Sequence, residues 1–331
     1  MSRRLSDAIG QTNNEVMNSV VEFNQVLKIK KPCDFFWAGL RVRVKRCFRL
    51  TVNRGIKMSR IAYTNIGSIK VTSLRDGELV LPAEALLNLK EEDAKEIKDN
   101  AENTLSYTNV NAFLIQNGDR NLLVDAGCRE LFGPTCGFVQ DALAEAGISI
   151  EQVTDIFLTH LHPDHIGGTL NTDGTAVFSN AQMHIIDTEH KFWANENFDA
   201  VEVNGADWAG LAQAVVTAYE DRLNLLTEGK EIMAGVSTVS IPGHTPGHSG
   251  FRVDSEDDNL IHLGDILHIQ NLQLIDPNVS TVFDIDHDTA LVSRKRVLDM
   301  VSSDKNLCTS GHWLSPKFGH IERFGAGYAI N

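Results

Sequence analysis

Thr159-His160-Leu161-His162-Pro163-Asp164-His165-Ile166-Gly167-Gly168 is the most informative stretch of this sequence, because it places four potential metal ligands within six residues. A short apolar run precedes it, which is typical of a buried strand that opens into a loop. On an extended chain His160 and His162 point the same way, and Asp164 and His165 then turn with the chain and can face a second ion. Neutral imidazole and carboxylate together suit zinc, iron or manganese. The alternative is a His-rich surface loop without a metal.

Three later positions have one form in common: each follows a predicted strand and lies beside a glycine, where the backbone can approach a metal closely. They are His244, Asp265 and His312. Each is a weak signal alone, since a Gly-His or Gly-Asp pair usually marks a turn. With the first stretch they supply five histidines and two aspartates. That set is enough for two divalent ions that share a bridging carboxylate and keep positions open for water and substrate.

The other histidines lack this context. We expect His248 to orient the loop around His244, with metal binding as the alternative. Asp125 ends a predicted strand and is a candidate to hold a metal ligand from behind, with a turn cap as the alternative. The remaining histidines are expected to be ordinary structural residues: His184, His190, His262, His268, His287 and His320.

The composition limits the classes of protein that the chain can represent. It has 331 residues and is 42% hydrophobic, which allows a substantial core in one large or two smaller domains. The formal net charge of −14 argues against a nucleic-acid partner. The five cysteines are odd in number and form no CxxC pair, so we expect a reducing, cytoplasmic location. No apolar run is long enough for a membrane span, and homodimerisation stays open.

Residues 1–57 differ in charge from the rest of the chain. Residues 1–60 contain 13 lysines and arginines but only 4 acidic residues, although acidic residues predominate overall. The chain opens with polar residues where a secretory signal needs an apolar centre. We therefore expect residues 1–57 to be a basic extension outside the fold and residues 58–331 to form the folded domain, with Met58 as an alternative start. A targeting or anion-binding segment is the other interpretation.

The order of the expected elements predicts an α/β fold. Arg75-Asp76-Gly77-Glu78 is expected to be a turn, and 117–119 to join a hairpin. Helices are expected at 83–100, 138–146, 190–229 and 286–301. Strands are expected at 69–74, 111–115, 121–125, 156–158, 181–186, 236–241, 259–263 and 307–312. Strands precede helices in two successive halves, which predicts two mixed β-sheets between outer helices, a four-layer sandwich.

The sequence resembles the metallo-β-lactamase superfamily across about residues 66–331. The resemblance implies an αβ/βα sandwich with a dinuclear metal centre between the sheets. The residues that carry it are His160-Leu161-His162-Pro163-Asp164-His165, the 243–248 loop, Gly264-Asp265 and Gly311-His312. The ligands that it implies are His160, His162 and His244 for one metal, Asp164, His165 and His312 for the other, and Asp265 as the bridge.

The resemblance also implies a hydrolase in which two divalent ions hold a hydroxide between them. Zn is the expected metal, with Fe or Mn as alternatives. Asp164 and Asp265 are expected to act in catalysis by holding the ions and orienting that hydroxide.

Several branches of the superfamily fit this sequence poorly. True β-lactamases usually lack a histidine after the motif aspartate and carry a secretion signal, whereas this chain has His165 and no such signal. Flavodiiron proteins place Glu at the position of His162 and carry a flavin domain. Glyoxalase II enzymes need a helical domain after the last ligand, but only 19 residues follow His312. The acidic charge disfavours the nucleases that process transfer RNA.

A finer resemblance is to the methyl parathion hydrolase family and its lactonase relatives. It rests on residues 71–77, 131–135, 192–193 and 319–321. It implies that Phe132 and Trp193 line an apolar substrate pocket, with packing in the core as the alternative. The expected substrate is an apolar lactone or aryl ester, and organophosphate hydrolysis is the alternative main activity. Further alternatives are a thioesterase, a nuclease, and a metal-binding protein that acts through a partner surface.

Overall fold

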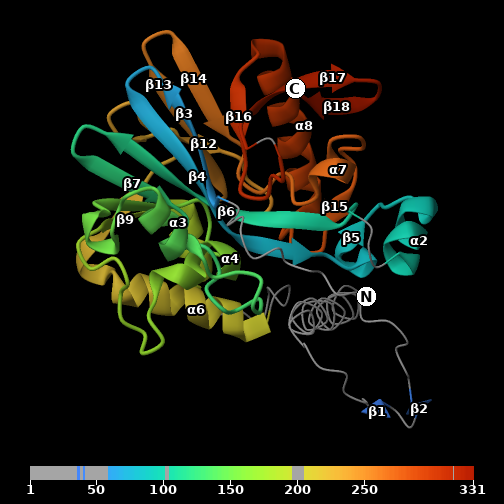
Figure 1. Cartoon of the computed structure of the whole chain (residues 1–331), viewed down its shortest axis with the longest axis horizontal. Helices are drawn as coiled ribbons and strands as arrows, with labels where there is room; N and C mark the ends of the chain where they lie inside the picture. The colour runs from blue at the N-terminus through green and yellow to red at the C-terminus, as the bar shows by residue number, and fades with distance from the viewer. Residues whose placement is uncertain (1–35, 38–39, 42–58, 101–103, 196–204, 316) are drawn as a thin grey trace.

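The computed structural model describes residues 36–37, 40–41, 59–100, 104–195, 205–315 and 317–331 (Figure 1). The expected basic extension over residues 1–57 lies outside this part, apart from two short strands, β1 (Phe36–Trp37) and β2 (Leu40–Arg41). The domain boundary near Met58 therefore stays a prediction. None of the described helices is both long and apolar enough to cross a membrane.

The first half of the chain forms one seven-stranded sheet with the strand order β10-β9-β8-β7-β6-β4-β3. Strands β7 to β10 are parallel to one another, and β3, β4, β6 and β7 pair antiparallel, so the sheet is mixed. Its strands are β3 (Ile61–Ile66), β4 (Ile69–Val80), β6 (Tyr107–Asn117), β7 (Arg120–Val124), β8 (Asp155–Leu158), β9 (Gln182–Ile186) and β10 (Leu223–Leu226).

The second half forms another seven-stranded sheet with the order β11-β12-β13-β14-β16-β17-β18, in which only β14 and β16 are parallel neighbours. Its strands are β11 (Glu231–Met233), β12 (Val236–Ser240), β13 (Ser249–Ser255), β14 (Asp258–His262), β16 (Leu307–Thr309), β17 (Gly319–Phe324) and β18 (Gly327–Ile330). The short strands β5 (Leu86–Leu87) and β15 (Ser280–Thr281) pair separately.

Helices cover the outer faces of the two sheets (Figure 1). The α-helices are α2 (Glu91–Asp99), α3 (Val139–Glu145), α4 (Pro163–Ile166), α5 (Asp187–Trp193), α6 (Gly205–Ala218), α7 (Gln270–Gln273) and α8 (His287–Asp304). The short 3₁₀ helices are η1 (Ala83–Ala85), η2 (Ile150–Gln152), η3 (Gly167–Thr169) and η5 (Glu220–Arg222).

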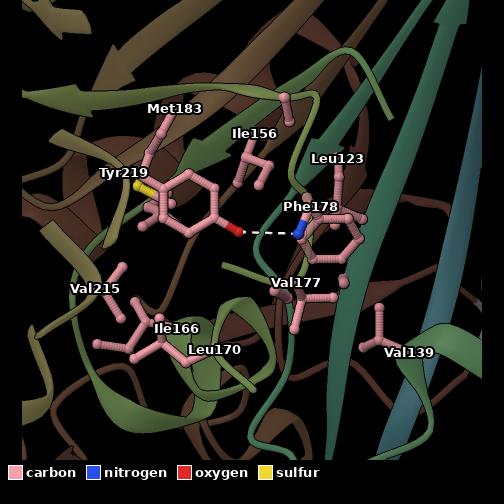
Figure 2. Packing of buried hydrophobic residues seen from close by; sticks show 14 of the residues in the cluster. Leu123, Val139, Ile156, Ile166, Leu170, Val177, Phe178, Met183, Val215 and Tyr219 are labelled. Atoms are coloured by element: carbon pink, nitrogen blue, oxygen red, sulfur yellow. Dashed lines mark hydrogen bonds between the residues drawn. The ribbon is translucent and has the colours of Figure 1, made fainter. Parts of the chain in front are cut away.

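The core has three apolar layers, which give the molecule its four layers of secondary structure. Between the sheets, Val71 and Phe113 of the first pack in one cluster with Phe251 of the second. Outside the first sheet, α3 and α6 pack on a cluster in which the Tyr219 hydroxyl accepts a hydrogen bond from the Phe178 amide (Figure 2). Outside the second sheet, α8 packs on β14 and β16. Burial of apolar side chains on both faces of each sheet drives this arrangement. The predicted α/β sandwich is confirmed.

The expected turn at residues 75–78 is wrong. Strand β4 continues through it with a bulge between Arg75 and Gly77. A Cβ at Gly77 would lie 2.2 Å from the Thr135 carbonyl oxygen, so only glycine allows that loop to pack here. The Asp76 carboxylate is buried and accepts hydrogen bonds from the amides of Cys128, Gly137, Phe138 and Val139.

Two predicted helices are shorter than expected, because strands interrupt them. In the 83–100 stretch, Leu86–Leu87 pairs with β15, so α2 begins only at Glu91. In the 190–229 stretch, β10 adds to the sheet edge beside β9. The hairpin at 117–119 and the helix expected at 138–146 are present, as β6 with β7 and as α3.

Candidate metal centre

The loop that holds the first four candidate ligands leaves the carboxyl end of β8. The Thr159 amide and hydroxyl each donate a hydrogen bond of 2.9 Å to the Asp125 carboxylate, which follows the neighbouring strand β7. A Cβ at Gly168 would lie 1.9 Å from the Ala126 carbonyl oxygen, so the loop needs glycine there to pack closely. These contacts fix the loop rigidly at the sheet edge.

The first ligand group consists of His160, His162 and His244, and its nearest ring nitrogens lie within 4.8 Å of one another. Nδ1 of His162 lies 2.9 Å from Nε2 of His244. All three side chains are buried, yet Nε2 of His160 has no hydrogen-bond partner among the described residues. Buried polar atoms are nearly always satisfied, so this unpartnered nitrogen fits a bound cation.

The second ligand group consists of Asp164, His165, Asp265 and His312, again with ligand atoms within 4.8 Å of one another. Oδ2 of Asp265 lies 3.0 Å from Nε2 of His165 and 2.8 Å from Nε2 of His312. Oδ2 of Asp164 lies 3.5 Å from both of these nitrogens. A site with two imidazoles and two carboxylates suits a divalent ion of the zinc, iron or manganese type.

Asp265 lies between the two groups. Its Oδ2 is 3.8 Å from Nε2 of His160 and 3.7 Å from Nε2 of His244, and its Oδ1 has no partner among the described residues. The Asp265 amide donates to Nε2 of His248 at 2.9 Å, and Nδ1 of His248 donates to the Ile241 carbonyl at 2.7 Å. Both ring nitrogens of His248 are therefore used, and it orients Asp265 from behind.

Three further contacts fix the orientation of the candidate ligands. Asp125 lies 2.8 Å from Nδ1 of His165, and Asp284 lies 2.9 Å from Nδ1 of His244. The Asn109 carbonyl oxygen lies 2.7 Å from Nδ1 of His312. Acceptors at Nδ1 hold the proton on that nitrogen, which leaves the Nε2 lone pair for a metal. The sequence singled out Asp125 but not Asp284 or Asn109, because neither belongs to a local motif.

Glu189, which the sequence analysis did not single out, joins the loops of the first ligand group. One carboxylate oxygen accepts hydrogen bonds from the Leu161 amide at 3.0 Å and from Nε1 of Trp193 at 2.6 Å. The other accepts from the Thr245 hydroxyl at 2.6 Å and from the Gly247 amide at 3.0 Å. A single buried carboxylate thus ties the loop after β8 to the loop after β12.

The pKa shifts differ between the two groups. Burial and the neighbouring imidazoles hold the pKa of His160 and of His162 well below the usual value. Burial also acts to lower the pKa of His165, but nearby carboxylates, led by Asp265, raise it well above the usual value. Burial acts to raise the pKa of Asp265, but His165 and His312 hold it well below its usual range. His160 and His162 thus offer neutral imidazoles, while the carboxylates of the second group attract a cation.

Comparison with known proteins agrees with this geometry. The family model of the metallo-beta-lactamase superfamily matches residues 106–312. The chain belongs to the metallo-β-lactamase superfamily. The chain is a metallo-β-lactamase-fold hydrolase. No curated protein sequence matches it.

Solved structures of the superfamily cover most of the chain. AidC, described as a dizinc quorum-quenching lactonase, is 25% identical with a TM-score of 0.74, over 82% of this chain and 97% of its own. The hydrolase AbOPH is 27% identical with a TM-score of 0.75, over 83% and 98%. A probable metal-dependent hydrolase from Staphylococcus aureus is 20% identical with a TM-score of 0.67, over 81% and 98%, and supports the fold alone.

His268 is a further histidine beside the candidate ligands, although the sequence analysis expected an ordinary structural residue. Its Nε2 lies 3.6 Å from Oδ2 of Asp265, and its ring stacks on that of His312 with centroids 5.0 Å apart. It lines the same cavity as the candidate ligands, and its Nδ1 has no partner among the described residues. Its position three residues after Asp265 is the one signal that could have identified it.

A small cavity of about 40 Å³ lies over the candidate ligands, and its other walls are largely apolar. Phe132 lines it. Trp193 does not: the residue is only 3% exposed, and its ring donates to Glu189 and lies edge-on to His162 with centroids 5.7 Å apart. Trp208 of α6 lines the cavity instead. The sequence could not separate the two tryptophans, because the docking of α5 and α6 decides which ring faces the cavity.

Proposed function

We propose that the chain hydrolyses lactones or aryl esters with two divalent metal ions, of which Zn²⁺ is the expected one and Fe or Mn the alternatives. The observation that carries the proposal is the pair of buried ligand groups that meet at Asp265 beneath an apolar cavity. The similar structure of AidC supports a lactone substrate, since that protein is described as a dizinc lactonase.

The ligand groups assign the ions to particular residues. His160, His162 and His244 would hold one ion, and Asp265 would contact both. The other ion would be held by Asp164, His165 and His312. Bound there, the ions would lower the pKa of bound water to about 7 and polarise the attacked carbonyl group.

The residues around the centre perform the remaining steps. Phe132 and Trp208 exclude water and bind the apolar acyl or aryl part of the substrate. His268 is placed to hydrogen-bond a substrate oxygen, because its ring lines the cavity beside Asp265. No lysine or arginine lines this cavity among the described residues, which disfavours carboxylated substrates such as β-lactams and glutathione thioesters.

Organophosphate hydrolysis is the second candidate function. The aromatic walls Phe132, Trp208 and Phe283 suit an aromatic leaving group, and two metal ions can also assist attack on phosphorus. The resemblance to the methyl parathion hydrolase family favours the same activity.

Two measurements test the proposal. Elemental analysis of protein purified without chelators should find about two divalent ions per chain. Screening the metal-loaded protein against lactones, aryl esters and phosphotriesters should give the highest kcat/KM for a lactone or aryl ester. A reproducible metal content near zero, with no binding on reconstitution, would refute the metal centre. Full metal loading without activity on any class would favour a protein that acts through a partner surface.

A further inference from the structure

A second cavity, of about 530 Å³, lies beside the metal centre. It is lined by the start of β3, by β4 and β6, and by the segment that follows His312. It shares Leu79 and Thr108 with the cavity over the candidate ligands. Its volume lies in the range of small-molecule sites, roughly 300–1,000 Å³.

The second cavity is positively charged, although the chain carries a net charge of −14. Arg60, Arg75 and Lys317 line it, and Glu78 is the one acidic residue among the described lining residues. Glu78 pairs with Arg75 at 2.6 Å, but its side chain is 64% exposed, whereas that of Arg75 is 19% exposed. Water screens the carboxylate more than the guanidinium, so the interior of the cavity stays positive.

The hydrogen-bond acceptors of Lys317 in this cavity are uncharged. Its Nζ donates to Oδ1 of Asn111 and to the Trp313 carbonyl oxygen, both at 2.9 Å, and both acceptors are uncharged. No carboxylate in the described part of the chain lies within ion-pair distance of it. Burial, followed by the charge of Arg75, lowers the pKa of Lys317 to about 7. In its ammonium form Lys317 has three N–H groups, so it keeps one for a ligand. A carboxylate bound there favours that charged form.

The rest of the lining is mainly apolar. Ile61, Leu79, Val80 and Leu314 form these walls, together with the ring of Tyr107. Lysine and arginine at one place and aliphatic side chains around them recognise a molecule with one acidic end and an apolar body.

We propose that this cavity binds a small apolar monocarboxylate, with its carboxylate on Lys317 and Arg75. The site is separate from the metal centre, and the proposal does not rest on the hydrolase activity. The second cavity and the metal centre are nevertheless connected through β6. In this strand the Thr108 hydroxyl donates to the His268 carbonyl at 2.6 Å, and the Asn109 carbonyl contacts His312.

Calorimetric titration of the metal-loaded protein with octanoate tests the assignment. Lys317→Met should weaken octanoate binding at least tenfold, and Lys317→Arg should weaken it less, because the positive charge remains. Lys295→Met is the matched control, since Lys295 is exposed on α8, away from this cavity, and its ammonium donates to Asn278. Octanoate binding should not change in this variant. Octan-1-ol should bind more weakly than octanoate, and inorganic phosphate should not compete with octanoate.

The same variants separate this site from the metal centre. Octanoate bound only to the metal ions would bind Lys317→Met as tightly as the parent protein, which would overturn the proposal. Lys317→Met should leave kcat and KM for a short neutral ester unchanged. A rise in that KM would place Lys317 on the substrate path and overturn the assignment of a separate site.

Arg75→Gln, which leaves the hydrogen bonds of Lys317 intact, should also weaken octanoate binding. Unchanged binding in both variants would refute the site.

Discussion

The two ligand groups of the metal centre face each other but differ in charge. The first group contributes three imidazoles and no carboxylate of its own. The second contains Asp164 and Asp265, and their charges raise the pKa of His165 although burial acts to lower it. The first group therefore attracts a cation through lone pairs alone, and the second also through its two carboxylates. We infer that the loss of a carboxylate from the second group disturbs the centre more than the loss of any one contact around the first.

The largest effect is expected for Asp265→Asn. The substitution removes the carboxylate charge that lies between the two groups, so it should abolish hydrolysis and lower the metal content well below about two ions per chain. Elemental analysis and ester hydrolysis by the same preparation measure the two effects.

His248→Ala is the contrasting variant. His248 accepts the Asp265 amide hydrogen but faces neither ligand group through a free nitrogen. The His248→Ala variant should therefore lose less metal than the Asp265→Asn variant. Equal loss from the two variants would show that the position of Asp265, rather than its charge, controls both groups.

A smaller effect on metal binding is expected for Asp284 and Asp125, the carboxylates that accept from a ligand histidine in the first and the second group, respectively. Asp284→Asn replaces the charged acceptor at Nδ1 of His244 with a neutral amide, and Asp125→Asn does the same at Nδ1 of His165. Each should lower the affinity for one ion about 10–100-fold. Competition with a chromophoric chelator, followed ion by ion, distinguishes the two sites. If each variant weakens both ions equally, the two groups behave as one unit and the comparison between them fails.

The sequence predicted the parts of the centre that are local along the chain. His160 to His165 lie within one loop, so their pattern alone indicated a metal site. His244, Asp265 and His312 come from separate strand ends, and only the resemblance to a family joined them. The hairpin at 117–119 was predictable for the same reason, because the Asn-Gly turn signal lies within it.

The missed features depend on contacts between distant residues. Glu189 meets Thr245, 56 positions later in the chain, and no local pattern reveals that contact. The Asp76-Gly77 pair fits both a turn and a bulge, and packing against Thr135 decides between them. The position of His268 in the centre could not be predicted, because the rings that it contacts, those of His244 and His312, belong to other parts of the chain.

The smallest effect on the centre is expected for the two tryptophans beside His162. Trp208→Ala removes a wall of the cavity and leaves the ligand groups unchanged, so both ions should stay bound. The loss in transition-state binding of a bulky apolar ester should be about 1–3 kcal/mol, the usual value of a hydrophobic pocket contact. The ratio of kcat/KM for a bulky and a small ester measures it.

Trp193→Ala is the matched comparison, because both rings contact His162 edge-on but only Trp208 lines the cavity. Trp193 is buried and donates to Glu189, so its loss should destabilise the fold by about 3–5 kcal/mol and leave the selectivity unchanged. Thermal unfolding and the same pair of esters test both points. A selectivity change in Trp193→Ala without one in Trp208→Ala would restore the pocket expected from the sequence. The substrate would then approach the first ligand group from the side of α5 rather than α6.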